Sequence, residues 1–282
     1  MTTDSTCRPQ DIGHAPASDE TIALGRLLDL DSEVLQAYLT DLTGWLAGLC
    51  ERQPAHIVDL AGGTGTGAFA LARRFPAASV TTLDLSPQLL HHLRKRASLL
   101  GVDDRVRGVQ ADLNEPWPPL DGADLVWAAS ALHHIADPGQ ALAQAFRALR
   151  PGGLVAVTEM DFFPRLLPED IGVGRPGLES RLHAALNTRP PWDWSGHLVD
   201  AGFVAVATRP FVIDLKPPLP PVTGQYAHAS LSLLRSHAAG LLAADDLAAL
   251  DVLLDTDDPL GVLRRPDLTV RTTRTTWVGR RP

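Results

Sequence analysis

Cysteine is almost absent from this 282-residue chain, which contains only Cys7 and Cys50. Neither belongs to a C-x-x-C pair, and a disulfide framework or a thiolate zinc site requires more cysteines. We therefore expect a reducing, cytoplasmic location and no bound metal. Long apolar runs are also missing, so no membrane-spanning helix is predicted. Residues 1–19 are polar and do not resemble a signal peptide, and we expect them to form a disordered tail.

The sequence also lacks an excess of positive charge. It has 33 acidic and 25 basic residues, which gives a formal net charge of −8. Surfaces that bind nucleic acids or anionic membranes carry clustered positive charge. We therefore expect neither nucleic acid nor a membrane as a partner, and a small molecule as substrate, while a homodimer remains open.

Strand and helix patterns alternate through most of the chain. Short apolar segments predict strands at residues 56–61, 79–85, 106–113, 123–130, 152–160, 204–215 and 268–281. The early strands are apolar on both faces and are separated by helical segments, as in a parallel sheet covered on both sides. The sequence therefore predicts an α/β fold.

Three segments interrupt this alternation. Residues 20–53 have apolar side chains at helical spacing and predict two or three helices, broken near residues 29–32. Residues 161–194 are rich in proline around one helix, and residues 216–266 combine a proline-rich connector with two helices. The core would then consist of residues 54–160, 195–215 and 267–282.

A glycine-rich turn, "AGGTGTG" at residues 61–67, lies between the first predicted strand and its helix. Glycines let the backbone approach a ligand, and the helix start offers free N–H groups. Residues 63–68 formally match the G-x-G-x-x-G/A pattern of nicotinamide dinucleotide sites, with Asp84 about 20 residues further on. S-adenosylmethionine is the other cofactor that this geometry suits.

The residues around the glycines resemble motif I of the class I S-adenosylmethionine-dependent methyltransferases, (D/E)xGxGxG. Here the motif reads Asp59-Leu60-Ala61-Gly62-Gly63-Thr64-Gly65, and Ala61 replaces the first glycine. The variant "DLAGGTG" is similar to that of the quinone C-methyltransferases. The resemblance assigns Asp59 to the network around the methionine amine, whereas a dinucleotide phosphate would gain nothing from this carboxylate.

The resemblance extends over residues 57–160 and includes the "LRPGG" turn at residues 149–153. It implies that Asp84 binds the ribose hydroxyls, and that Asp112 and Leu113 contact the adenine. It also implies a Rossmann-like sheet of seven strands, six parallel and the C-terminal one antiparallel, with helices on both faces. The expected cofactor-binding residues are Asp59, Ala61, Gly62, Gly63, Thr64, Gly65, Asp84, Leu85, Ala111, Asp112, Leu113, Ala128 and Ala129.

Catalysis by such an enzyme requires alignment of acceptor, methyl and sulfur, and a base where the acceptor must lose a proton. His133 and His134 follow the fourth predicted strand, and an imidazole with a pKa near ~6.5 can accept a proton at neutral pH. Counting from the "LRPGG" turn places an acidic partner at Glu159. The alternative is that the histidines only shape the pocket.

The resemblance also implies that the three interrupting segments form helical lid insertions over the acceptor. They are helical or proline-rich and apolar, so we predict a small, fairly hydrophobic acceptor. We expect methylation at oxygen or nitrogen in preference to carbon. Trp192 and Trp194 would line the acceptor pocket or pack in the core. The alternatives are an NAD(P)-dependent oxidoreductase and a methyltransferase-fold protein with a non-methylating role.

Overall fold

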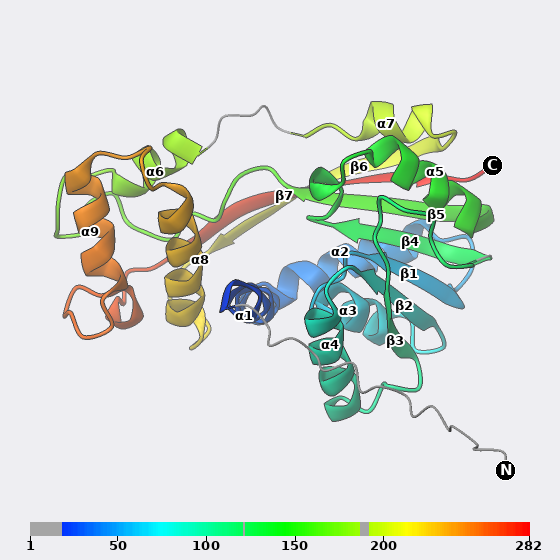
Figure 1. The fold of residues 1–282 in the computed structure, drawn as a ribbon, viewed down its shortest axis with the longest axis horizontal. Helices are drawn as coiled ribbons and strands as arrows, with labels where there is room; N and C mark the ends of the chain where they lie inside the picture. Colours follow the sequence, from blue (N-terminus) through cyan, green and yellow to red (C-terminus); the bar gives the residue numbers. More distant parts are fainter. Residues whose placement is uncertain (1–18, 121, 187–191) are drawn as a thin grey trace, which may run out of the picture.

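A seven-stranded sheet forms the centre of the computed structural model, which describes residues 19–120, 122–186 and 192–282 (Figure 1). Its strands are β1 (His56–Leu60), β2 (Ser79–Asp84), β3 (Val106–Gln110), β4 (Ala123–Ala129), β5 (Leu149–Met160), β6 (Val204–Leu215) and β7 (Val270–Arg280). Their spatial order is β3-β2-β1-β4-β5-β7-β6. Strands β1 to β5 pair in parallel, and β7 runs antiparallel to both of its neighbours. The predicted Rossmann-like fold with an antiparallel last strand is confirmed.

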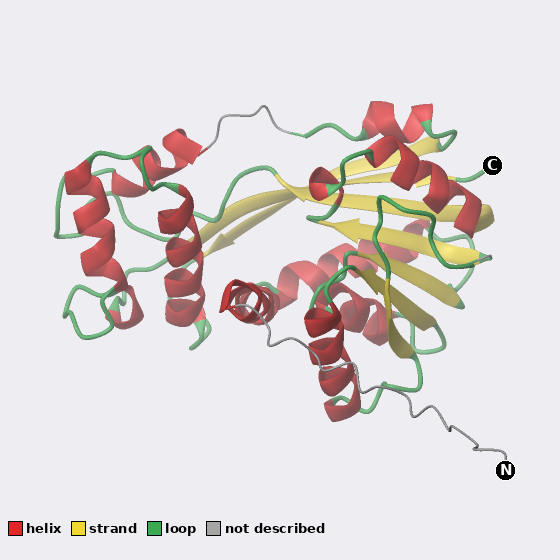
Figure 2. Ribbon diagram, viewed as in Figure 1, coloured by secondary structure: helices red, strands yellow, loops and turns green. Residues whose placement is uncertain are grey.

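Helices cover both faces of this sheet (Figure 2). One buried apolar cluster joins the sheet to α2 (Gln36–Leu49), α3 (Thr66–Arg74) and α4 (Pro87–Leu99), and a second joins it to α5 (Pro138–Ala148) and α7 (Ser195–Asp200). Two of these helices begin as their sequences dictate: proline occupies the first turn, and the preceding Ser86 or Asp137 accepts a hydrogen bond from a backbone N–H of that turn.

The remaining helices lie mostly at one end of the molecule. They are α1 (Asp19–Val34), α6 (Leu178–Leu186), α8 (Thr223–His237) and α9 (Ala244–Leu254), with the 3₁₀ turns η1 (Leu132–His134) and η2 (Val262–Arg264). Strands β6 and β7 extend beyond the rest of the sheet, and α6, α8 and α9 gather around this extension (Figure 1). Helix α1 packs against both α8 and the core helices, so it lies between the two parts.

The predicted break near residues 29–32 is wrong, because α1 continues to Val34 and the chain turns only at Leu35. The acidic residues that suggested a break have partners in the tertiary structure. Asp29 pairs with Arg96 of α4, and Asp31 pairs with Arg274 of β7. These partners explain why polar residues interrupt the apolar pattern without ending the helix.

The "LRPGG" segment also differs from its prediction as a turn, since β5 already begins at Leu149. Gly152 has a φ of +78°, and the register with β4 shifts in this region. The segment is therefore an irregular start of β5. The expected disordered tail at residues 1–19 falls, apart from Asp19, outside the residues that the structure describes.

Candidate active site

The glycine turn follows β1 at the carboxyl edge of the sheet, and three of its positions exclude a normal side chain. Gly63 and Gly65 have φ angles of +56° and +86°. A Cβ on Gly62 would lie only 2.2 Å from Asp59 Oδ2. Ala61, which replaces the first glycine of the motif, also has a positive φ of +48°. The turn thus needs glycine geometry at each of these points and tolerates strain at Ala61.

Asp84 ends β2 beside this turn and is fixed by backbone donors. The Gly63 N–H donates to its Oδ2 at 2.8 Å, and the Ser86 N–H donates to its Oδ1 at 2.8 Å. A carboxylate has about four lone-pair sites, so further acceptor capacity remains. Asp84 therefore joins the glycine turn to the start of α4 and can still accept bonds from a ligand's hydroxyls.

Asp59 lies beneath the glycine turn, with 2% of its surface exposed. Its Oδ2 has no hydrogen-bond partner among the residues described by the structure. Burial and the neighbouring charge of Asp84 raise the pKa of Asp59 to about 7. This carboxyl group therefore supports the turn from the core side.

The other predicted cofactor residues divide into accessible and covered side chains. Leu85, directly after Asp84, is 62% exposed. Asp112 Oδ1 accepts bonds from the backbone and side-chain nitrogens of Asn114, both at 2.9 Å, and these bonds lower the pKa of Asp112. By contrast, protein covers the side chains of Thr64, Leu113 and Ala128, whereas Gly62, Ala111 and Ala129 are partly accessible.

Helix α1 closes one side of the glycine turn. A Cβ on Gly63 would lie 2.9 Å from the Leu28 side chain. Asp29 holds this part of α1 to α4 through Arg96 and through His92, whose Nε2 lies 2.8 Å away. The N-terminal segment thus contributes directly to the walls of the site.

His133 and Glu159 meet at the ends of β4 and β5. His133 Nδ1 lies 2.8 Å from Glu159 Oε2, and Glu159 is 1% exposed. The ring of His134 lies 3.9 Å from that of His133, and burial together with the charge of His133 lowers the pKa of His134. The two histidines and the acid predicted from the sequence therefore form one cluster.

The backbone turn that connects β4 to this cluster is strained. Ser130 has a φ of +51°, and its N–H donates to the Thr158 carbonyl of β5 at 2.8 Å. A non-glycine residue in this region costs on the order of 1 kcal/mol or more. The bond to β5 holds the turn that carries His133 next to the strand that carries Glu159.

Aromatic rings from the segment after α6 cover His133. The Trp192 ring stacks on His133 with centroids 5.7 Å apart, and Trp194 stacks on Trp192 at the same separation. Trp194 is buried in the core, whereas Trp192 is 36% exposed. Trp192 thus lines the histidine cluster, and Trp194 packs behind it.

A second polar cluster beside the strand ends was not predicted from the sequence. Arg274 of β7 donates to Asp31 Oδ1 at 2.6 Å, the Tyr226 hydroxyl donates to the same oxygen at 2.9 Å, and the guanidinium lies 5.2 Å from the Tyr38 ring centre. Burial raises the pKa of Tyr38 to about 12. The only sign of this polar cluster in the sequence was an arginine within the alternating pattern of the last strand.

Among residues 19–120, 122–186 and 192–282, no three histidine, cysteine, aspartate or glutamate side chains gather as a metal site would require. No helix in these ranges combines the length and apolar character needed to cross a bilayer.

Comparison with known proteins agrees with this geometry. Residues 57–153 match the model of the methyltransferase domain family. The match identifies this part of the chain as a methyltransferase domain. The predicted membership in the S-adenosylmethionine-dependent family is thereby confirmed for these residues, while the particular motif variant stays a prediction.

Two curated relatives each match less than half of this chain. The 27-O-demethylrifamycin SV methyltransferase of Amycolatopsis mediterranei is 34% identical over 137 residues, 48% of this chain and 50% of that protein. The demethylmenaquinone methyltransferase of Thermus thermophilus is 40% identical over 111 residues, 39% and 49% of the two chains. The chain thus spans about half the length of the curated relatives it matches.

Solved structures share the fold over a larger part of the chain. The [4+2]-cyclase SpnF superimposes with a TM-score of 0.52 and 20% identity, covering 86% of this chain and 81% of that one. Likeness at this identity shows the fold alone, and function has to be argued from the site.

Proposed function

We propose that this protein transfers a methyl group from S-adenosylmethionine to a small, fairly hydrophobic molecule. The juxtaposition of the His133–Glu159 pair with the Asp84-anchored glycine turn, at one edge of the sheet, carries this proposal. The names of the curated relatives include both C- and O-methyltransferases, so they support the reaction class and leave the acceptor atom open.

The residues around the glycine turn suit the cofactor. Asp84 would accept bonds from the ribose hydroxyls, the exposed Leu85 would cover one face of the adenine, and Asp112 would accept from its amino group. Asp59, with its buried unpartnered oxygen, would stabilise the positively charged amine end. When bound, the cofactor supplies a methyl group on a sulfonium, which leaves by in-line displacement.

His133 would act as the base. A Nδ1–H donated to Glu159 leaves Nε2 free to accept a proton from the acceptor, and the buried carboxylate stabilises the imidazolium that forms. Hydroxyl and protonated amine acceptors need such a base, and we place oxygen and nitrogen ahead of carbon as the methylated atom. An acidic C–H acceptor would use the same pair.

The acceptor would lie between this pair and the helical segments. Trp192 provides an apolar ring on His133, and α1 packs between α8 and the core helices, where its Asp31 pairs with Arg274 of β7. These segments, from residues 20–53, 161–194 and 216–266, would form the lid over a small substrate and exclude water.

Cofactor choice is tested by calorimetry with S-adenosylhomocysteine, NAD(H) and NADP(H). We expect S-adenosylhomocysteine alone to bind, and Asp84→Asn to weaken it about ten- to hundredfold because a charged acceptor is lost. Asp103→Asn, on an exposed turn, is the matched control and should bind like wild type. Binding of a nicotinamide cofactor alone would reverse the proposal.

Methyl transfer itself is tested with a methyl-labelled cofactor and a metabolite extract. Label in a small organic product, absent without the protein, supports the proposal and identifies the acceptor. Tight cofactor binding with no labelled product across a broad acceptor panel would favour a non-methylating role on the same fold.

A further inference from the structure

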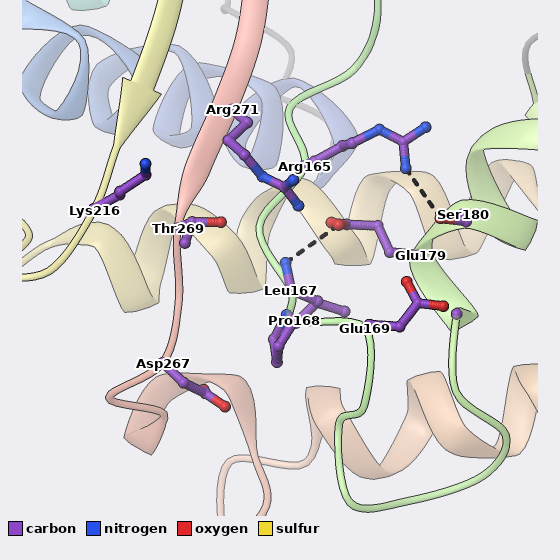
Figure 3. Close-up of a pocket in the computed structure, with 11 residues that line it drawn as sticks. Arg165, Leu167, Pro168, Glu169, Glu179, Ser180, Lys216, Asp267, Thr269 and Arg271 are labelled. Carbon is purple, nitrogen blue, oxygen red and sulfur yellow. Dashed lines mark hydrogen bonds between the residues drawn. The ribbon is translucent and has the colours of Figure 1, made fainter.

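A cavity of about 360 Å³, drawn in Figure 3, is lined by none of the candidate active-site residues. It forms where the loop after β5, the start of α6, the end of β6 and the start of β7 meet. Three cationic side chains line it: Arg165, Arg271 and Lys216. We propose that this cavity binds a small oxyanion, a phosphate or carboxylate group carried by a small molecule.

The two arginines are held side by side by the backbone. Arg165 and Arg271 face each other in an antiparallel bridge and exchange both N–H···O bonds, at 2.8 and 2.9 Å. Like charges directly opposite each other on neighbouring strands destabilise the pairing. A bound anion would remove this repulsion, and the planar guanidinium groups suit carboxylate and phosphate oxygens.

Carboxylates also line the cavity, but other donors occupy two of them. Asp267 forms a two-bond pair with Arg265, at 2.9 and 2.7 Å. Glu179 accepts the backbone N–H groups of Leu166 at 2.6 Å and Leu167 at 3.2 Å. Within the described ranges, no carboxylate oxygen lies within 4 Å of a guanidinium nitrogen of Arg165 or Arg271.

The floor of the cavity is less negative than its composition suggests. Glu179 is 5% exposed, and burial raises the pKa of its carboxyl group to about 7, so near neutral pH much of it carries no charge. The buried Thr269 hydroxyl has no hydrogen-bond partner among the described residues and is available to a ligand. Figure 3 shows the Glu179 carboxyl near the guanidinium end of Arg271, whereas the Arg165 guanidinium points towards Ser180 and donates to its hydroxyl at 3.2 Å.

Calorimetry on the full chain tests the site with sulfate and with malonate, against chloride at equal ionic strength. We expect at least one of the two oxyanions to bind and to raise the melting temperature beyond the effect of chloride. Arg271→Gln should weaken that binding about tenfold or more. Arg94→Gln, an exposed arginine on α4, is the control and should bind like wild type.

Two further variants guard against misfolding as an explanation. Arg165→Gln should weaken the oxyanion as Arg271→Gln does, while Glu179→Gln at pH 8 should bind it more tightly, because a negative charge is removed. S-adenosylhomocysteine binding should stay unchanged in all of them. The proposal is overturned if neither oxyanion exceeds chloride, or if folded Arg271→Gln binds like wild type.

Discussion

The cofactor side and the acceptor side of the candidate active site are built in different ways. The cofactor side uses short segments: Asp59 and Asp84 lie at the ends of two neighbouring strands, and the Gly63 N–H of the turn between them donates to Asp84. The acceptor side joins residues far apart in the chain, such as Asp31 with Arg274. Local sequence therefore determines how the cofactor side is arranged, whereas long-range side-chain contacts determine the acceptor side.

Removing the proposed catalytic base on the acceptor side should have the largest effect on turnover. His133→Asn should reduce kcat by about 10²- to 10⁴-fold, as expected for loss of a general base, and leave S-adenosylhomocysteine affinity unchanged. The assay uses the acceptor identified by labelling, and His91→Asn on the exposed face of α4 is the control. Equal turnover in the variant would remove His133 as the base.

Breaking the long-range Arg274–Asp31 pair should act on stability. Arg274→Met leaves a largely buried carboxylate without its cation and should lower the free energy of unfolding by about 2 to 4 kcal/mol, measured by urea denaturation. Adding Asp31→Leu should restore part of that loss. Arg235→Met breaks the more exposed pair with Asp251 and should cost about 1 kcal/mol or less. Equal losses in both single variants would contradict the difference between the two pairs.

The pH dependence of the unfolding free energy tests the role of Asp59 on the cofactor side. The pKa of Asp59 is raised to about 7 in the folded protein, so its contribution to stability is present at low pH and is lost as the pH rises towards 7. Asp59→Asn should remove this loss, which is on the order of 3 kcal/mol, and flatten the unfolding free energy between about pH 4 and pH 7. Identical pH profiles for the variant and wild type would show that Asp59 does not titrate in this range.

The smallest effect is expected at the strained alanine of the glycine turn. Ala61→Gly removes a Cβ at a φ of +48° and should stabilise the protein by about 0.5 kcal/mol, measured by thermal unfolding. Ala184→Gly, on the exposed face of α6, should instead destabilise it by about 1 kcal/mol. Loss of stability at Ala61 would mean that its methyl group contributes packing that outweighs the strain.

Much of the core was predictable because its signals are local. The strands at residues 56–61 and 79–85 and the glycine turn between them follow from apolar runs and glycine positions that neighbouring residues enforce. The pairing of His133 with Glu159 could be anticipated only through the family resemblance. The stacking of Trp192 on His133 was left open between packing and pocket lining, and the structure shows the ring against the histidine.

Two predictions could not be made from the sequence for physical reasons. Asp29 and Asp31 looked like a helix break because their partners, Arg96 and Arg274, lie 67 and 243 residues away. The facing arginines Arg165 and Arg271 belong to an isolated bridge outside the regular sheet pairing. No periodic pattern in the sequence predicts this bridge.

The sequence by itself determined the order of strands and helices, the parallel core and the positions that require glycine, because each depends on residues within a few positions of one another. Only the tertiary structure decided how α1 packs against the glycine turn, and which arginines form ion pairs with carboxylates. These outcomes depend on burial and on charges brought together from distant parts of the chain, where several pairings are compatible with the same local pattern.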